Sequence, residues 1–507
     1  MNTRRRQSVV IFKGIVPLVL GLFVALFVLR SGPNARGAAL TEAYDFRALY
    51  CGGAATLARA NPYRVEPLRS CEHDRSPSKL FLADVPKWVV LPAPYPGYAL
   101  ELFSGLAHFS FPVAKAIYLG LLTAALGYLA IALAALSGWP IFVVGLALLP
   151  TVVLYNMWLG STPPIAMLGL ALAAIAVWKE RPALAVAPLA VAMIDPHLAL
   201  PAAIALVVIA PKARVAAGIG LVALVALSVH AIGILGNIEY FQEVLPMHAR
   251  AEVFVRLQYS LTHVLAVLGV PVEIALKAGT LSYAAAAIAA IVFVSRGADS
   301  ALGRARAIVF PSAVVALGGT FIHNQEISLA LPAAFVLART VSSTRDRLLL
   351  TVGFMGLLFS PIFDNLRLVA PAYVLASIAI AATIWPRRRI VASASAACAA
   401  LILIFGIRAL PHERFTDTSA ASLPEPPGIT ATTSSGVVWA QFLARRPSWT
   451  HEDAVSIAFK SPTWIGLICI IVLGARTRGL RTSPVRDRLV DCGSVTRPSA
   501  IAATTQA

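Results

Sequence analysis

The stretch "IFKGIVPLVLGLFVALFVL" occupies residues 11–29 and follows Arg4, Arg5 and Arg6. A helix needs about 20 apolar residues to cross the hydrocarbon core of a bilayer, and this run has that length. No small-residue cleavage site closes it at signal-peptide length, so we interpret it as a retained signal anchor. The preceding arginines place the N-terminus in the cytoplasm. The segment after Arg30 is then external.

The composition of the whole chain extends this interpretation from one membrane span to many. Of 507 residues 58% are hydrophobic and 13% are charged, and the mean hydropathy is +0.78. Soluble domains contain about 45–50% apolar and about 25% charged residues, so the composition predicts an all-α polytopic membrane protein. The apolar runs are too long and continuous for the alternating strands of a membrane β-barrel.

The net charge of +18 comes from short basic clusters between the apolar runs. Such clusters mark the cytoplasmic ends of membrane spans, so we expect no nucleic-acid partner. If all of them are cytoplasmic, the runs between them cross in pairs, which gives about 12–14 spans. The clusters are 179–181, 212–214, 296–306, 339–347, 387–389 and the tail from Arg476.

Four parts follow from this topology. They are 1–29, a cytoplasmic N-terminus and first span; 30–112, a long first external loop; 113–475, a transmembrane bundle with external loops; and 476–507, a basic, disordered cytoplasmic tail. External segments carry most of the acids, histidines, tryptophans and tyrosines, so a site is expected on that face. The later external segments are the turns near Gly160 and Asp195, 237–279, "HNQE" at 323–326, "DNLR" at 364–367, and 412–456.

The first polar segment of that loop predicts a helix lying at the membrane interface. Apolar residues recur at helical spacing from Phe46 to Ala60, with Arg47 and Arg59 off the stripe. Asp45 stands at its start, either as a helix cap or as a catalytic base. By the same rule Asp195 is expected to cap the helix that follows it.

Cys51 and Cys71 share the first external loop. They form a disulfide if the loop faces an oxidising compartment, and otherwise they remain two free thiols. The sequence leaves this choice open.

Five segments in chain order resemble glycosyltransferase family 87, polytopic enzymes of the GT-C superfamily that use polyprenyl-phosphate sugars. The resemblance covers most of the chain from Asp45 to Pro332. The segments are "DFRALYCGGAATLARANPY" (45–63), "APYPGYALELF" (93–103), "YNMWLGSTPPIAML" (155–168) leading to "MIDPHLALP" (193–201), "RLQYSLTHVLAVLGV" (256–270) and "FIHNQEISLALP" (321–332).

The resemblance implies a GT-C-like fold, with Asp45 as the catalytic base and His323 as a second catalytic residue. Three motifs depart from the family, which has Tyr-Pro-Pro, Gly-Gln and Lys-Pro where this chain has Tyr95-Pro96-Gly97, Gly160-Ser161 and Asp195-Pro196. An aspartate cannot pair with a lipid phosphate as that lysine could. A phosphate needs a cation, for which the candidates are Arg250, Arg256 and Lys87.

The expected substrate-binding residues follow from what this reaction needs. Sugar transfer from a lipid phosphate needs a base, cations for the leaving phosphate, and aromatic surfaces for the sugar ring. The external segments supply all three kinds, and the acid Glu42 lies near Asp45. The substrate-binding set is Glu42, Tyr44, Tyr95, Arg250, Arg256 and Tyr259.

The expected function is transfer of a hexose or pentose, mannose-like or arabinose-like, from a polyprenyl-phosphate sugar to a glycolipid or polysaccharide acceptor. We expect no metal and no further cofactor, because no acidic pair at close spacing demands one and no nucleotide-binding loop is present. The expected location is the bacterial plasma membrane, with the site on the external, periplasmic face. The alternative is a secondary transporter or flippase of a lipid-linked or amphipathic substrate, although no two-fold internal repeat supports it.

Overall fold

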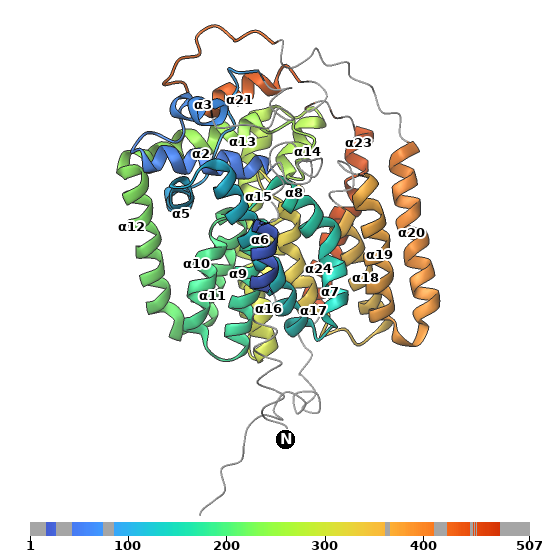
Figure 1. Cartoon of the computed structure of the whole chain (residues 1–507). Helices are drawn as coiled ribbons and strands as arrows, with labels where there is room; N and C mark the ends of the chain where they lie inside the picture. Colours follow the sequence, from blue (N-terminus) through green and yellow to red (C-terminus); the bar gives the residue numbers. More distant parts are fainter. Residues whose placement is uncertain are drawn as a thin grey trace, which may run out of the picture.

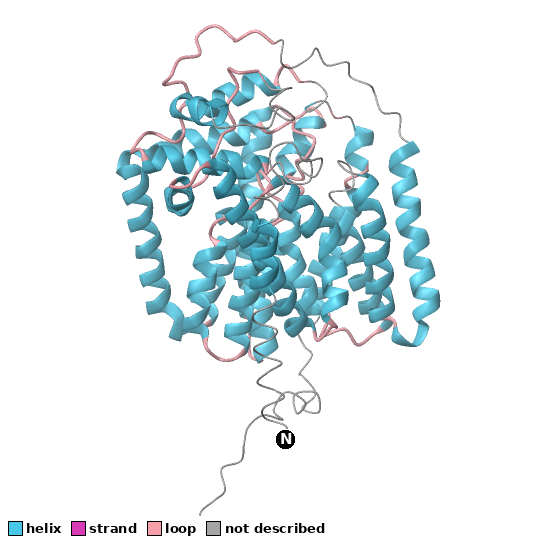
Figure 2. Ribbon diagram, in the orientation of Figure 1, coloured by secondary structure: helices cyan, strands magenta, loops and turns pink. Residues whose placement is uncertain are grey.

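A computed structural model describes residues 17–26, 43–74, 86–359, 366–409, 423–446, 450, 452 and 454–476. Within these ranges the chain is helical and has no strand, which confirms the all-α prediction (Figure 2). Six helices there are long and apolar enough to cross a membrane, and six shorter apolar helices accompany them. The coarse prediction of a multi-pass membrane protein is thereby supported, whereas a total of 12–14 spans stays a prediction.

The helices form two layers (Figure 1). A bundle of upright helices makes the lower layer, and short helices lying across its upper end make a cap. The cap contains α2 (Tyr44–Leu57), α3 (Val65–Asp74), α13 (Leu245–Ala251), α14 (Leu261–Val267) and α21 (Ser435–Leu443). Next to the cap lie α5 (Gly97–Ala107), α8 (Asn156–Leu159) and the short helix α23 (Ala454–Ala458).

The bundle follows the apolar runs of the sequence. Its helices are Pro17–Leu26, α6 (Phe111–Ser137), α7 (Ile141–Leu148) continued by η2 (Leu149–Tyr155), α9 (Pro163–Trp178), η3 (Pro182–Ala185) with α10 (Val186–Ala192), α11 (Pro196–Ile209), η4 (Pro211–Ala213) with α12 (Arg214–Glu239) and η5 (Tyr240–Val244), α15 (Val272–Ser295), α16 (Ala301–Val315), η6 (Glu326–Ala330) with α17 (Leu331–Leu337), α18 (Thr344–Phe359), α19 (Leu366–Ile384), η7 (Pro386–Arg388) with α20 (Arg389–Ala409), and α24 (Ser461–Arg476).

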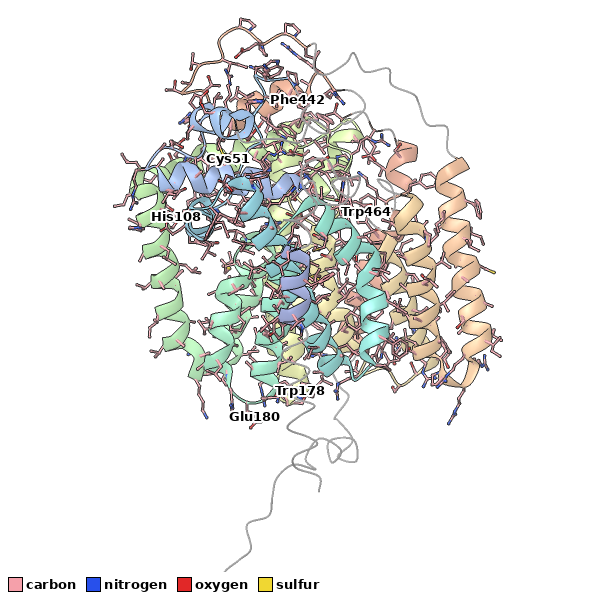
Figure 3. All side chains as sticks on the ribbon, viewed as in Figure 1. Cys51, His108, Trp178, Glu180, Phe442 and Trp464 are labelled. Atoms are coloured by element: carbon pink, nitrogen blue, oxygen red, sulfur yellow. A yellow bond between two sulfur atoms is a disulfide. The ribbon has the colours of Figure 1, made fainter. Side chains whose placement is uncertain are left out.

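The first polar segment forms the predicted helix, α2, but its surroundings differ from the expectation. Arg47 was placed off the apolar stripe, yet it is buried, with its guanidinium 5.6 Å from the centre of the Phe111 ring. The reason is that α3 folds back over α2, joined to it by a disulfide between Cys51 and Cys71 (Figure 3). The structure thus decides the question that the sequence left open for these cysteines.

The basic turns gather at the end of the bundle opposite the cap. Trp178 and Glu180 mark this end in Figure 3. Contacts join the turns to one another, since the Arg339 guanidinium lies 4.7 Å from the Trp178 ring and Arg304 pairs with Glu180 at 2.9 Å. The predicted external segments that the structure describes lie at the other end, where residues 61–66 hydrogen-bond to 431–435. The two classes of segment are therefore separated in space, as the charge pattern predicts.

This separation gives a topology prediction. We expect a reporter inserted at Glu180 to read as cytoplasmic and one inserted at Gly428, in the cap, to read as external, because basic turns stay on the cytoplasmic side. Paired fusions to an enzyme that is active only in the cytoplasm and to one that is active only outside provide the measurement. Two insertions reading the same compartment would contradict the assignment.

Candidate functional site

A cavity of about 1580 Å³ lies where the cap meets the bundle. One wall is apolar and consists mainly of Leu221, Leu224 and Val225 on α12, with Leu200 on α11. Leu221 is 64% exposed and Val225 is 52% exposed although both line the cavity, so the cavity opens sideways along α12. The charged and titratable side chains of the lining are Asp45, Asp195, His197, His248, Glu252, Arg256, His323, Glu326, Glu452 and Lys460, besides its tyrosines.

The turn after α8 brings Asp45 to this cavity. The Ala43 amide donates to the Trp158 carbonyl at 3.0 Å, which fixes the start of α2 against the turn. Gly160 has φ of +66°, and a Cβ atom there would lie 2.8 Å from the Ala43 Cβ. Only glycine accepts both this backbone conformation and this approach at little cost. Two segments far apart in the sequence, the start of α2 and the turn at Gly160, therefore position the Asp45 carboxylate.

Asp45 does not cap its helix, because the N-cap residue is Ala43 and no side chain bonds the first turn. Its carboxylate lines the cavity and is partly exposed there, beside the Ser161 side chain, whose hydroxyl also donates to Asn156 Oδ1 at 3.2 Å. Burial raises the pKa of Asp45 to about 6, although the charge of His323 and the bond from Ser161 oppose this shift. A base with a pKa near the working pH is suited to proton transfer. The helix start alone would have predicted a lowered pKa.

Asp195 is a second aspartate of the cavity, and its side chain does not cap α11 either. The Thr162 hydroxyl donates to Asp195 Oδ1 at 2.9 Å, while Oδ2 has no hydrogen-bond partner among the described residues. The residue is only 4% exposed. Burial raises the pKa of Asp195 to about 7, and the neighbouring negative charge of Glu326 adds to the shift. The expectation of a cap is wrong because a tertiary partner takes the carboxylate.

The glutamates of the cavity are paired with histidines. Glu252 Oε2 lies 3.4 Å from His323 Nε2, and the Trp439 indole donates to the other oxygen of Glu252. Burial alone would raise the pKa of Glu252, but the bond and charge of His323 hold it below its usual value. Burial likewise opposes protonation of His323, yet Glu252 raises the pKa of this imidazole. Each partner therefore favours the charged form of the other.

Two further histidines lie against glutamates. His197 Nε2 lies 3.3 Å from Glu326 Oε2, which also accepts the His323 backbone amide at 2.8 Å. His263 is hydrogen-bonded to Glu452, and the Lys460 ammonium donates to the same carboxylate at 2.6 Å. Among the described residues no group of three or more metal-binding side chains is arranged to hold a metal ion.

Two of the motifs that resemble the family lie side by side. The Tyr259 amide donates to the Ile322 carbonyl at 2.7 Å, and the Asn324 amide donates to the Leu257 carbonyl at 2.9 Å. These bonds join "RLQYSL" to "FIHNQE" and place His323 at the cavity. The sequence presents these motifs separately, 64 residues apart as measured from Gln258 to Ile322.

The structure places most of the residues proposed from the sequence at the cavity. Those lining the cavity are Tyr44, Asp45, Tyr95, Arg256 and His323. Tyr44 packs edge-on against the Trp158 ring with centroids 5.5 Å apart, which forms an aromatic wall beside Asp45.

Four proposed residues lie elsewhere. Arg250 is not in the cavity lining, since it pairs with Glu273 at the surface, where both side chains are 57% exposed. Tyr259 is buried beside the cavity, with Lys460 Nζ 5.3 Å from its ring centre. Lys87 is exposed outside the lining, and Glu42 lies outside the described residues.

Sequence reasoning gave no role to Glu252, His248, Trp439 and Lys460. Lys460 is a lone lysine at the start of the last apolar run. This position is the one sequence signal for it, because a charge there needs a buried partner. Nothing local in the sequence points to the bond between Glu252 and Trp439, which are 187 residues apart.

The fold and the cavity define the class: an all-helical, multi-pass membrane protein with carboxylates and histidines enclosed beneath a cap. Comparisons with models of protein families, with curated proteins and with solved structures find no match. The function is therefore argued from the site.

The Gly160 turn gives a prediction. We expect Gly160→Ala to lower the stability by at least about 1 kcal/mol, because a left-handed alanine costs about 1–2 kcal/mol and its methyl group would press on Ala43. The measurement is thermal unfolding of the detergent-solubilised chain. Gly218→Ala is the matched control: nothing lies within 4 Å of the added methyl group, so this variant should be at least as stable as the wild type. Equal melting temperatures for both variants would contradict the assigned role of Gly160.

Proposed function

We propose that this chain is an integral-membrane glycosyltransferase that moves a hexose or pentose from a polyprenyl-phosphate sugar to a glycolipid or polysaccharide acceptor. The observation that carries the proposal is one cavity joining a carboxylate with a raised pKa, aromatic walls and an apolar side open along α12. A lipid-linked sugar has the matching parts, namely a polar ring, a phosphate and a prenyl chain. The resemblance to glycosyltransferase family 87 points to the same chemistry.

The reaction needs few groups. Asp45 accepts the proton of the acceptor hydroxyl, whose oxygen attacks the anomeric carbon of the donor sugar. The bond from that carbon to the phosphate oxygen breaks, and its electron pair leaves with the polyprenyl phosphate. The charged form of His323, which its pairing with Glu252 favours, stabilises the carboxylate form of Asp45 before the transfer.

The leaving phosphate needs a cation within reach. Of the arginines proposed from the sequence, Arg256 lines the cavity and Arg250 does not, which supports Arg256 for this role. Rings for stacking a sugar come from Tyr44, Tyr95 and Trp158.

Two features support an external site. The basic turns lie at the far end of the bundle, which by the charge rule is the cytoplasmic one. The disulfide between Cys51 and Cys71 lies in the cap, next to the cavity, and disulfides persist in oxidising compartments. The bacterial plasma membrane, with the cavity on its periplasmic side, fits both features.

Replacement of the proposed base tests the function. We expect Asp45→Asn to remain folded and membrane-inserted, because the amide keeps the shape, and to transfer sugar at least about 10²-fold more slowly. The measurement is passage of radiolabelled sugar from short-chain polyprenyl-phosphate mannose, glucose or arabinose into membrane glycolipid. Glu273→Gln, a surface carboxylate outside the cavity lining, is the control and should retain full activity.

A wild-type chain that transfers none of these sugars, but moves the lipid-linked sugar across vesicle membranes, would contradict the enzyme and favour the flippase. Normal transfer by Asp45→Asn in a working assay would remove Asp45 from the reaction.

The raised pKa of Asp45 gives a pH prediction. The base works only when deprotonated, so with a pKa of about 6 the transfer rate should rise with pH through that value and level off above it. The measurement is initial rate against pH between about 5 and 8, with the melting temperature recorded at each pH. A flat profile in a stable protein would contradict the assignment.

A further inference from the structure

The carboxylates of the cavity fall into two sets. Each of the three glutamates described above lies against a histidine, and Glu452 also pairs with the Lys460 ammonium. The two aspartates lie instead against the hydroxyls of two consecutive residues: Ser161 lies beside Asp45 and also donates to Asn156 Oδ1, and Thr162 donates to Asp195. One turn therefore directs two carboxylates into one cavity.

One carboxylate oxygen of Asp195 receives no hydrogen bond from the described residues. The helix that follows it does not take the carboxylate as a cap, and Thr162 occupies Oδ1 alone. Oδ2 is buried in a residue that lines the cavity and has no hydrogen-bond partner among the described residues. Buried polar atoms in folded proteins are almost always bonded, so an orphan acceptor facing a cavity points to a donor group brought by a ligand.

The charges around Asp195 restrict what that donor group is. A phosphate would be repelled by Asp195 itself and by Asp45, whose charge reaches it, whereas Glu326 is paired with His197. A sugar hydroxyl carries a donor and no charge, and Tyr95 and Tyr98 lie in the same lining to pack against the ring.

We propose that Asp195 Oδ2 accepts a hydrogen bond from a ring hydroxyl of the donor sugar, and so distinguishes the sugar-bearing lipid from bare polyprenyl phosphate. This inference rests on the proposed function. The ring is that of the donor because Asp45 acts on the hydroxyl that attacks this ring, and neighbouring residues of one turn hold both aspartates. Met193 and Leu200, on either side of Asp195 in the chain, also line the cavity and lead toward the apolar wall.

Binding measurements on the full chain in nanodiscs test this. The probes are short-chain polyprenyl-phosphate mannose, glucose and arabinose, and polyprenyl phosphate without a sugar. We expect Asp195→Ala to weaken binding of at least one sugar-bearing probe by about 10-fold or more, the usual effect of losing a hydrogen bond to a charged group. Binding of the sugar-free lipid should stay within about twofold of the wild type.

Asp346→Ala is the matched control. This aspartate is also mostly buried, and its carboxylate accepts the Ser343 backbone amide, but it lies at the basic end beside Arg476. It should bind every probe as the wild type does.

The outcomes separate the two proposals. A wild-type chain that binds neither kind of lipid overturns the proposed function and this inference with it. A wild-type chain that binds both, with Asp195→Ala losing both equally or losing neither, overturns this inference alone. Equal loss would mean that Asp195 only supports the shape of the cavity.

Discussion

Close contact between α2 and the bundle is the constraint on which the site depends. The hydrogen bond from Ala43 to Trp158 holds one end of α2, and Gly160 permits the approach. Further along the helix, a Cβ atom at Gly53 would lie 2.5 Å from the backbone of Phe103 on α5, so glycine is needed there too. These contacts hold Asp45 at the cavity, partly covered by protein, instead of leaving it at an outer aqueous surface. The raised pKa of Asp45 follows from that cover.

Buried polar contacts join the helices of the cap to one another and to the bundle. The bond of Glu252 to Trp439 connects α13 to α21, and Lys460 connects the start of α24 to Glu452 and to the Gln258 carbonyl. A buried ion pair adds little net stability, but removing one partner is costly, so such pairs fix an arrangement more than they strengthen it. The histidine–glutamate pairs therefore set the shape of the cavity and leave the two aspartates to face its interior.

The sequence predicted what depends on local pattern. Apolar runs predicted the helices, the stripe from Phe46 predicted α2, and basic clusters predicted which turns share an end. It failed where a side chain has both a local and a distant partner. Asp195 has the position of a helix cap, but Thr162, 33 residues earlier, takes its carboxylate. Arg47 has the position of a solvent-facing residue, but α3 folds over it, and no periodicity within α2 reports that cover.

Basic and acidic groups lie on different sides of the cavity, and this distribution of charge fits a phosphate-linked sugar. Arg256 and Lys460 of the lining both lie near the segment 256–258. Arg256 belongs to this segment, and the Lys460 ammonium donates to the Gln258 carbonyl at 2.8 Å. Its unpaired acidic groups gather at the turn of Ser161 and Thr162. His323 lies between the two sides, because its chain neighbours Ile322 and Asn324 bond to Tyr259 and Leu257 while its charge acts on Asp45. A donor lipid with its phosphate near Arg256 and its sugar toward the aspartates would place the bond to be broken between them. The opposite orientation would put the phosphate against two carboxylates, and their repulsion excludes it.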